Sequence, residues 1–308
     1  MIDICLATYN GEKYLEAQLN SIVAQAYTNW HLWVRDDGSS DSTVAILEKY
    51  RSEYIDNVTL ITDNKGNLGY NDNFLEILKY TSSDYIAFCD QDDIWLPEKL
   101  KCLYDELKQI EGNEKFVPVI VHSNFDYFKH GIIYPKESSL DKRVVNNRNT
   151  LKIIFHQGCL LGCTSMINRA MIELGNRLPK NNSIGYDIYF LAVSSIVGKY
   201  SYVNRILIHH QIHASNTSSV GKKTKLFLLF WKVIRFDVSS LAAQKIVARK
   251  LLSDYETKLR PQVKEALQFL VDLDKKAFFK KVQFYFSNKL FSVSLNGVVT
   301  LLRLLLNK

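Results

Sequence analysis

Three carboxylates fall within four positions of the chain, in the segment FCDQDDIW at residues 88–95. Asp90, Asp92 and Asp93 follow an apolar run directly, and like charges this close raise one another's pKa unless a cation lies among them. Magnesium and manganese ions prefer oxygen ligands, commonly one or two carboxylates together with substrate phosphates. The spacing therefore predicts a divalent-cation site that bridges the protein to a diphosphate. The alternative interpretation is a solvated acidic turn.

An alternation of short apolar runs with helical periodicities over the first 125 residues indicates how these carboxylates are positioned. The expected strands are residues 2–8, 31–36, 57–62, 84–89 and 117–121. Strands separated by helices form βαβ units, whose parallel sheets are buried on both faces. The fold class is therefore predicted to be α/β, with a mostly parallel central sheet.

Polar residues follow four successive strands of this expected sheet. The groups are Thr8–Tyr9–Asn10, Asp36–Asp37, Asp63–Asn64 and Asp90–Asp93. Because ligands bind outside the carboxyl ends of strands in open α/β sheets, we expect one shared site there. The first strand is followed by TYNGEKYL rather than a glycine-rich phosphate loop, and no P-loop motif occurs anywhere. This argues against a dinucleotide-binding dehydrogenase and against a P-loop NTPase.

The cysteines and the N-terminus favour a reducing compartment. Five scattered cysteines without a CxxC pair form neither a disulfide framework nor a structural zinc site. The first residues run straight into a strand-like segment and do not resemble a signal peptide. A cytoplasmic location is therefore expected.

Charge is divided unevenly along the chain. Residues 1–215 hold 21 Lys+Arg against 26 Asp+Glu, whereas residues 216–308 hold 18 against 6. Beyond about residue 220 the sequence is helical, aromatic and basic, and its apolar stretch 290–306 is short for a membrane span. Such a basic region favours an anionic partner, either nucleic acid or a membrane surface, and basic residues beside aromatic ones favour interfacial helices on an anionic membrane. The alternative is helices that pack on the catalytic domain or on a second subunit, which leaves a homo-oligomer open.

Four motifs in serial order resemble a known family. They are ATYNGEKYL (7–15), RDDGSSDST (35–43), NLGYNDN (67–73) and FCDQDDIWLPEKL (88–100). Together they are similar to the inverting family-2 glycosyltransferases of GT-A fold, and in particular to bacterial rhamnosyltransferase-type enzymes of polysaccharide assembly. The resemblance covers about residues 1–220. It implies a GT-A domain at 1–220, followed by a C-terminal helical region at 221–308.

The resemblance implies roles for the nucleotide-binding residues. Asp37 would accept the N3–H of a uracil or thymine ring. Asp90 would face the ribose or share the metal, Asp92 would bind the metal, and Asp93 is given no role. The other nucleotide-site residues would be Thr8, Tyr9 and Asn10, which line the base pocket, and Gly69 and Asn73, which border the nucleotide.

Downstream the match is looser but keeps its order. GCLLGCTSMINRAM (158–171) resembles the strand that borders the donor sugar, and IGYDIYFL (184–191) places Asp187 where the family keeps its catalytic base. HHQIHASN (209–216) resembles the segment from which His213 would reach the metal or the diphosphate. His209 and His210 replace the usual Tyr-Arg, so the partner of the phosphate stays open.

The resemblance implies an inverting, metal-dependent hexosyltransferase that uses Mg²⁺ or Mn²⁺. Its donor would be dTDP-L-rhamnose, and its acceptor a lipid-linked saccharide in cell-surface polysaccharide synthesis. Such an acceptor implies that the basic C-terminal region contacts the inner face of the plasma membrane and that there is no nucleic-acid partner. A UDP-hexose or UDP-N-acetylhexosamine donor is the alternative. From other classes, a sugar nucleotidyltransferase would need a glycine-rich, basic loop that TYNGEKYL lacks, and a non-catalytic nucleotide-sugar binding module would not use Asp187.

Overall fold

The computed structural model places most of the chain in two compact units. The described residues are 1–129, 131–134, 150–154, 161–175, 185–213, 239–288 and 290. The first unit contains the described residues up to 134, together with 161–175 and 198–213. The second contains 150–154, 185–197 and the described residues from 239 onwards.

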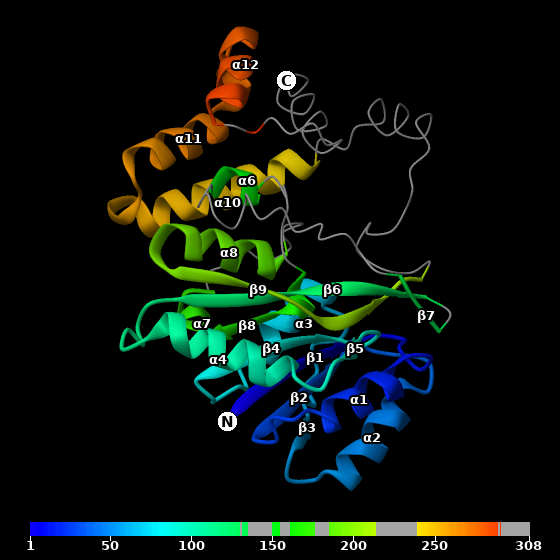
Figure 1. Cartoon of the computed structure of the whole chain (residues 1–308). Helices are drawn as coiled ribbons and strands as arrows, with labels where there is room; N and C mark the ends of the chain where they lie inside the picture. The colour runs from blue at the N-terminus through cyan, green and yellow to red at the C-terminus, as the bar shows by residue number, and fades with distance from the viewer. Residues whose placement is uncertain are drawn as a thin grey trace. The chain divides into compact units, whose positions relative to one another are not determined.

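The first unit is built on a twisted nine-stranded sheet, counted over the described residues (Figure 1). Its order is β3-β2-β1-β4-β8-β6-β9-β5, and β7 pairs with β6. The strands are β1 (Ile2–Thr8), β2 (Trp30–Asp36), β3 (Val58–Leu60), β4 (Tyr85–Asp90), β5 (Ile94–Trp95), β6 (Val119–Lys129), β7 (Ile132–Tyr134), β8 (Ser165–Asn168) and β9 (Lys199–Gln211).

The five strands expected from the first 125 residues are all present, as β1, β2, β3, β4 and β6. β3, β2, β1 and β4 run parallel to one another, as do β6 and β9, while β8 is antiparallel between β4 and β6. The register sets Thr8 opposite Asp36, and Ala7 opposite Asp90. The polar ends of β1, β2 and β4 therefore lie at one edge, as predicted.

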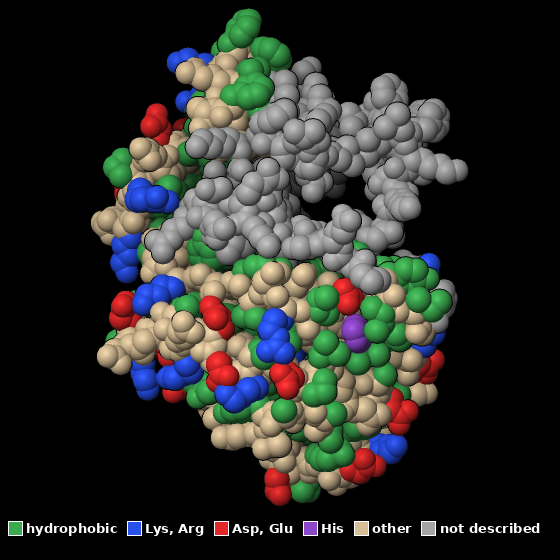
Figure 2. All heavy atoms as spheres, viewed as in Figure 1, with side chains coloured by type: hydrophobic (Ala, Val, Ile, Leu, Met, Phe, Trp, Pro, Cys, Tyr) green, Lys and Arg blue, Asp and Glu red, His purple; other side chains and the backbone are tan. Residues whose placement is uncertain are grey.

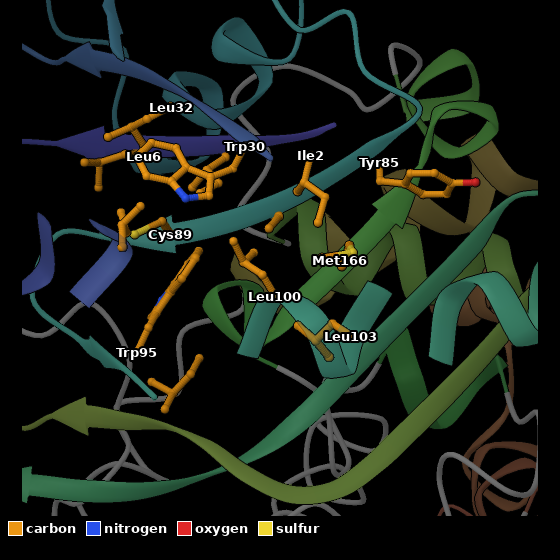
Figure 3. Packing of buried hydrophobic residues seen from close by; sticks show 14 of the residues in the cluster. Ile2, Leu6, Trp30, Leu32, Tyr85, Cys89, Trp95, Leu100, Leu103 and Met166 are labelled. Carbon is orange, nitrogen blue, oxygen red and sulfur yellow. The ribbon is translucent and has the colours of Figure 1, made fainter. Parts of the chain in front are cut away.

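Helices cover the sheet of this unit. They are α1 (Leu15–Val23), α2 (Thr43–Glu53), α3 (Tyr70–Ile77), α4 (Lys99–Glu111) and α7 (Arg169–Gly175), with a 3-10 turn η1 (Gly162–Thr164). Leucines of α1 and α4 pack with β1 and β4 in one hydrophobic core, in which Trp95 and Leu100 lie close to Cys89 (Figure 3). Burial of this apolar surface anchors the strand ends that carry the polar residues.

The second unit is helical. Its elements are α6 (Thr150–Ile154), α8 (Tyr186–Val197), α10 (Ser239–Tyr255), η2 (Glu256–Lys258), α11 (Pro261–Val271), η3 (Leu273–Lys275) and α12 (Phe278–Ser287). Phe269 of α11 stacks on Phe284 of α12, with ring centroids 4.3 Å apart. The predicted C-terminal helical region is thus observed over 239–288. The aromatic segment 225–236 and residues 291–306 lie outside the described residues.

None of the helices that the structure describes combines the length and the apolar character needed to cross a bilayer.

Candidate active site at the carboxyl ends of the parallel strands

The acidic loop leaves β4 at Asp90 and enters β5 at Ile94. Its three carboxylates have different surroundings. Asp93 is fully buried, whereas Asp90 and Asp92 are half-buried at the edge of the sheet. The three carboxylates are therefore close in the sequence but differ in burial: one lies in the interior, and two are partly exposed at the edge of the sheet.

Asp93 forms a buried ion pair with β9. Its Oδ1 lies 2.7 Å from Nδ1 of His210 and 3.3 Å from the backbone N of Gln211, which donates to it. Burial by itself lowers the pKa of His210, but the charge and hydrogen bond of Asp93 and the other two aspartates raise it to about 9. For Asp93 burial acts to raise the pKa, and the contact with His210 outweighs it and holds the pKa below its ordinary value. This pair, which the sequence did not reveal, ties the acidic loop to β9.

Asp93, Cys163 and His210 form a triad that could hold a metal, since their donor atoms lie within 4.8 Å of one another. Two ligands of a tetrahedral zinc ion lie about 3.3 Å apart, as follows from metal–ligand distances near 2 Å. The 2.7 Å between Asp93 and His210 is instead a hydrogen-bond distance. Oδ1 of Asp93 and Nδ1 of His210 are therefore hydrogen-bonded to each other, whereas the buried Oδ2 of Asp93 has no hydrogen-bond partner among the described residues.

The structure brings together Asp92 and His213, which are 121 positions apart in the sequence. Nε2 of His213 lies 2.6 Å from Oδ2 of Asp92. The His213 ring stacks on Tyr14, with centroids 4.9 Å apart and planes 18° apart. A histidine and a carboxylate predicted to share a metal are thus adjacent, and an aromatic side chain from the start of α1 supports the histidine.

The electrostatics of Asp90 and Asp92 fit a hard cation. Burial, followed by the charges of Asp93 and Asp92, raises the pKa of Asp90 to about 7. The pKa of Asp92 is also raised, by burial first and then by Asp93. Burial and neighbouring negative charge both disfavour two ionised carboxylates here, and carboxylate oxygens are ligands that Mg²⁺ and Mn²⁺ prefer. The donor set of Asp90, Asp92 and His213 therefore fits the predicted cation.

Lys99 is a fully buried lysine behind the acidic loop. Its Nζ donates to the carbonyl oxygen of Cys163 at 2.9 Å and lies 3.1 Å from the centre of the Trp95 ring. Burial lowers its pKa to about 7, although the nearby acidic groups act to raise it. Lys99 thus joins α4 to the segment before β8.

The residues predicted to line the base pocket follow β1. Thr8 is buried and its Oγ1 donates to Asp36 at 2.8 Å. Tyr9 is 50% exposed, and Asn10 has a left-handed φ of 47°. Oδ1 of Asn10 accepts from the backbone N of Ser40 at 2.8 Å. The loops after β1 and β2 are therefore held together, and Tyr9 is half exposed.

Asp37 is buried and already has three hydrogen-bond donors. Oδ1 accepts from Arg35 at 2.7 Å and from the backbone N of Leu68 at 2.8 Å, and Oδ2 accepts from that of Gly69 at 2.8 Å. A carboxylate offers about four acceptor positions, so one remains on Oδ2. The recognition of a base N–H by Asp37 stays a prediction, which this arrangement allows.

Gly69 and Asn73 belong to the same network. Gly69 has a φ of 77°, which favours glycine at the start of α3. Asn73 is buried, and its Oδ1 accepts from Arg35 at 2.9 Å. Arg35 also makes two bonds to Asp63, at 2.9 and 3.0 Å, and donates to the carbonyl oxygen of Gly66. Arg35, which was given no predicted role, is thus the centre of the hydrogen-bond network that holds the segment expected to border the nucleotide.

Asp187 lies in the first turn of α8, in the second unit, and is half-buried. Its Oδ1 accepts from the backbone N of Ile188 at 2.8 Å. Tyr186 begins the helix, so Asp187 lies inside its first turn. Its assignment as the catalytic base stays a prediction.

With this geometry in place, similarity to known proteins identifies the family. The sequence profile of Glycosyl transferase family 2 matches residues 3–173, more than half of the chain. The chain belongs to glycosyl transferase family 2. This glycosyltransferase is 28% identical over 256 residues to the dTDP-rhamnosyl transferase RfbG of Shigella flexneri, which covers 77% of this chain and 83% of RfbG.

Two further proteins extend the comparison. The UDP-Glc:alpha-D-GlcNAc-diphosphoundecaprenol beta-1,3-glucosyltransferase WfgD of Escherichia coli is 30% identical over 177 residues, 56% of this glycosyltransferase and 62% of WfgD. The structure of S. aureus TarS 1–349 with UDP-GlcNAc superposes with a TM-score of 0.58 at 17% identity, covering 97% of this chain and 90% of that one. The predicted GT-A fold is confirmed.

Proposed function

We propose that this glycosyltransferase transfers L-rhamnose from dTDP-rhamnose to a lipid-linked saccharide in bacterial cell-surface polysaccharide synthesis. The observation that carries a nucleotide-sugar reaction is the edge where Asp90, Asp92 and His213 meet the loop after β1. The rhamnosyl donor is supported by the likeness to RfbG over most of both chains. The likeness to WfgD favours a UDP-hexose as the second candidate and supports a lipid-linked acceptor.

Asp90, Asp92 and His213 would hold Mg²⁺ or Mn²⁺. Such a cation, when bound, supplies neutralisation of the negative charge on the departing nucleoside diphosphate. Asp37 would accept the base N–H at its remaining acceptor position, and Thr8–Asn10 would line the base pocket. Gly69 and Asn73 would border the nucleotide through the Arg35 network.

Asp187 would take the proton of the acceptor hydroxyl as that oxygen attacks the anomeric carbon. The bond from this oxygen forms as the bond to the diphosphate breaks, so a single displacement inverts the configuration. A β-L-rhamnosyl donor would then give an α-L-rhamnoside.

Asp92→Ala tests the nucleotide and cation assignment. We expect wild-type protein to be stabilised against heat by dTDP-rhamnose or by a UDP-sugar in the presence of Mn²⁺, and less so with EDTA. Loss of a metal ligand should weaken Mn²⁺-dependent donor binding by about 100-fold, at the upper end of the effect of altered supporting residues. The measurement is calorimetric titration with the donor that the thermal screen selects.

Asp56→Ala is the matched control, because Asp56 is an exposed carboxylate just before β3, at the amino end of the parallel strands. It should bind the donor like wild type. Wild-type protein that binds no nucleotide sugar with either metal would overturn the proposed function. Formation of a nucleotide sugar from a sugar 1-phosphate and a nucleoside triphosphate would point to the nucleotidyltransferase alternative.

We further propose that α12 contacts the anionic membrane that carries the acceptor. Phe278, Phe279 and Phe286 are 56%, 82% and 54% exposed, and Figure 2 shows hydrophobic side chains gathered on α12 with lysines beside them. Residues 275–308 contain seven Lys+Arg and no Asp or Glu. Exposed phenylalanines flanked by lysines match an interfacial helix on anionic lipid.

Replacing Phe278, Phe279 and Phe286 together by serine should lower the partition onto phosphatidylglycerol-containing vesicles at least tenfold, since each buried phenylalanine contributes about 1.5–3 kcal/mol. Vesicle flotation of the full chain measures this. Phe116→Ser, at a phenylalanine that is 95% exposed in the first unit, is the control. Equal flotation of wild type and the triple variant, or no flotation at all, would remove the α12 contact.

A further inference from the structure

The loop between β1 and α1, residues 9–14, contacts both halves of the proposed donor site. Toward the acidic loop it meets Gln91. The backbone N of Tyr9 donates to Oε1 of Gln91 at 2.8 Å, and Nε2 of Gln91 donates back to the carbonyl oxygen of Tyr9 at 3.0 Å. Gln91 lies between Asp90 and Asp92, so this two-bond contact joins the β1–α1 loop to the residues that would hold the cation.

Gly11 leaves the space that this contact needs. A Cβ placed on Gly11 would lie 2.4 Å from Oε1 of Gln91 and 2.7 Å from its Cδ. Two non-bonded heavy atoms cannot approach so closely, and the amide is the free end of the Gln91 side chain. Any side chain at position 11 would therefore displace the Gln91 amide while the backbone of both loops stays in place.

On its other side the same loop is fixed to the β2–α2 loop and to the first residue of α2. The backbone N of Asn10 donates to Oγ of Ser39 at 2.8 Å, and that of Gly11 donates to Oγ1 of Thr43 at 2.7 Å. These bonds hold the loop beside the segment that includes Asp37. A shift of the β1–α1 loop upon base binding would thus be transmitted to Gln91.

A second contact runs from the end of the loop to the cation ligands. The backbone N of Tyr14 donates to the carbonyl oxygen of Gly11 at 3.0 Å, so Tyr14 belongs to the same turn. Its ring stacks on His213, which in turn is 2.6 Å from Asp92. The loop therefore holds the acidic loop at Gln91 and the histidine at Tyr14.

We infer that the β1–α1 loop couples nucleotide binding to cation binding, with Gln91 and Tyr14 as positioning residues. The inference rests on the proposed function. Coupling between two ligands is reciprocal and typically changes each affinity by 5- to 150-fold. Gln91 contacts the backbone of Tyr9, so its loss should loosen the link between the sites and leave the base contacts in place.

The experiment measures the affinities of the protein for dTDP and for UDP by calorimetric titration, once with Mn²⁺ and once with EDTA. For the nucleotide that binds more tightly, the affinity in Mn²⁺ is divided by the affinity in EDTA. Gln91→Ala and Tyr14→Ala should each lower the Mn²⁺-to-EDTA ratio about tenfold. The affinity in EDTA should stay within about twofold of wild type. Tyr14→Phe keeps the ring that stacks on His213 and should restore the wild-type ratio.

Gly11→Ala provides an independent variant that touches neither ligand site directly. It should lower the ratio like Gln91→Ala, and combining the two should add almost nothing, since the clashing amide is then absent. A merely destabilised fold would instead give additive losses and would lower the EDTA affinity as well.

Unchanged ratios in Gln91→Ala and Gly11→Ala, or effects of the two that add, would overturn the coupling while the donor assignment stands. Wild-type protein that binds neither nucleotide would overturn the proposed function and the coupling together.

Discussion

Asp187→Asn is expected to give a folded protein that binds its sugar donor and transfers the sugar 10²- to 10⁴-fold more slowly, the usual contribution of a general base. Asparagine keeps the size of the side chain and the oxygen that accepts from the backbone N of Ile188. It removes the basicity that would take the proton of the acceptor hydroxyl. Packing and donor affinity should therefore change little.

The measurement separates chemistry from binding. Single-turnover transfer to acceptor is compared with the dissociation constant of the donor, and the two should diverge for Asp187→Asn. Glu173→Gln, at an exposed carboxylate on α7, serves as the control and should keep the wild-type rate. A wild-type rate in Asp187→Asn, or a product with retained anomeric configuration, would contradict the assignment of Asp187.

The parallel strands and their polar ends were predictable because each strand has a recognisable local sequence pattern. A buried run such as IDICLAT followed by TYN carries both the strand and the site residue in one segment. Parallel pairing then places Thr8 and Asp90 at the same edge without any long-range information. The juxtaposition of Asp92 and His213 came from the order of motifs in a known family, because no local pattern relates residues 121 positions apart.

The supporting residues were not predictable in the same way. His210 looked like a departure from the family pattern until β9 paired with β6 and β5 and brought it to Asp93. Arg35 follows the apolar residues Leu32–Val34 near the end of β2, and its four partners come from three different segments. The available signal was a basic residue that directly follows an apolar run and directly precedes two aspartates.

The membership of the second unit also depends on distant contacts. α6 and α8 come from the middle of the chain, yet they group with α10, α11 and α12. α8 is apolar on nearly all sides, with Tyr189 and Phe190 fully buried, so it must pack against other helices. The sequence of α8 alone does not identify those helices. The expected boundary near residue 220, between the catalytic domain and the C-terminal helical region, therefore stays a prediction.

Arg35→Met is expected to lower the free energy of unfolding by about 3–5 kcal/mol, the usual cost of removing one partner of a buried ion pair. Arg35 is 2% exposed, and the change leaves the carboxylates of Asp37 and Asp63 without their cation. The loop that carries Leu68 and Gly69 should loosen with them, so donor affinity falls too. Urea unfolding at pH 7 measures the first effect and donor titration the second.

The dependence of stability on acidic pH tests whether the ion pair of Arg35 with Asp63 causes this loss of stability. Hydrogen bonding to Arg35, which outweighs burial, holds the pKa of Asp63 at about 2, below the unfolded value of about 3.9. This stabilisation is complete above about pH 4 and is lost as the pH falls toward 2. The difference in stability between wild type and Arg35→Met should therefore shrink over that range.

Arg51→Met is the matched control, since Arg51 pairs with Glu48 on the exposed face of α2 with both side chains about half exposed. Such a surface pair contributes about 0.5 kcal/mol or less, so unfolding should hardly change. A comparable loss in both variants would show that arginine packing in general, rather than the network of Asp37 and Asp63, stabilises this domain. An Arg35→Met protein that unfolds like wild type and binds donor normally would remove Arg35 from the support of the nucleotide site.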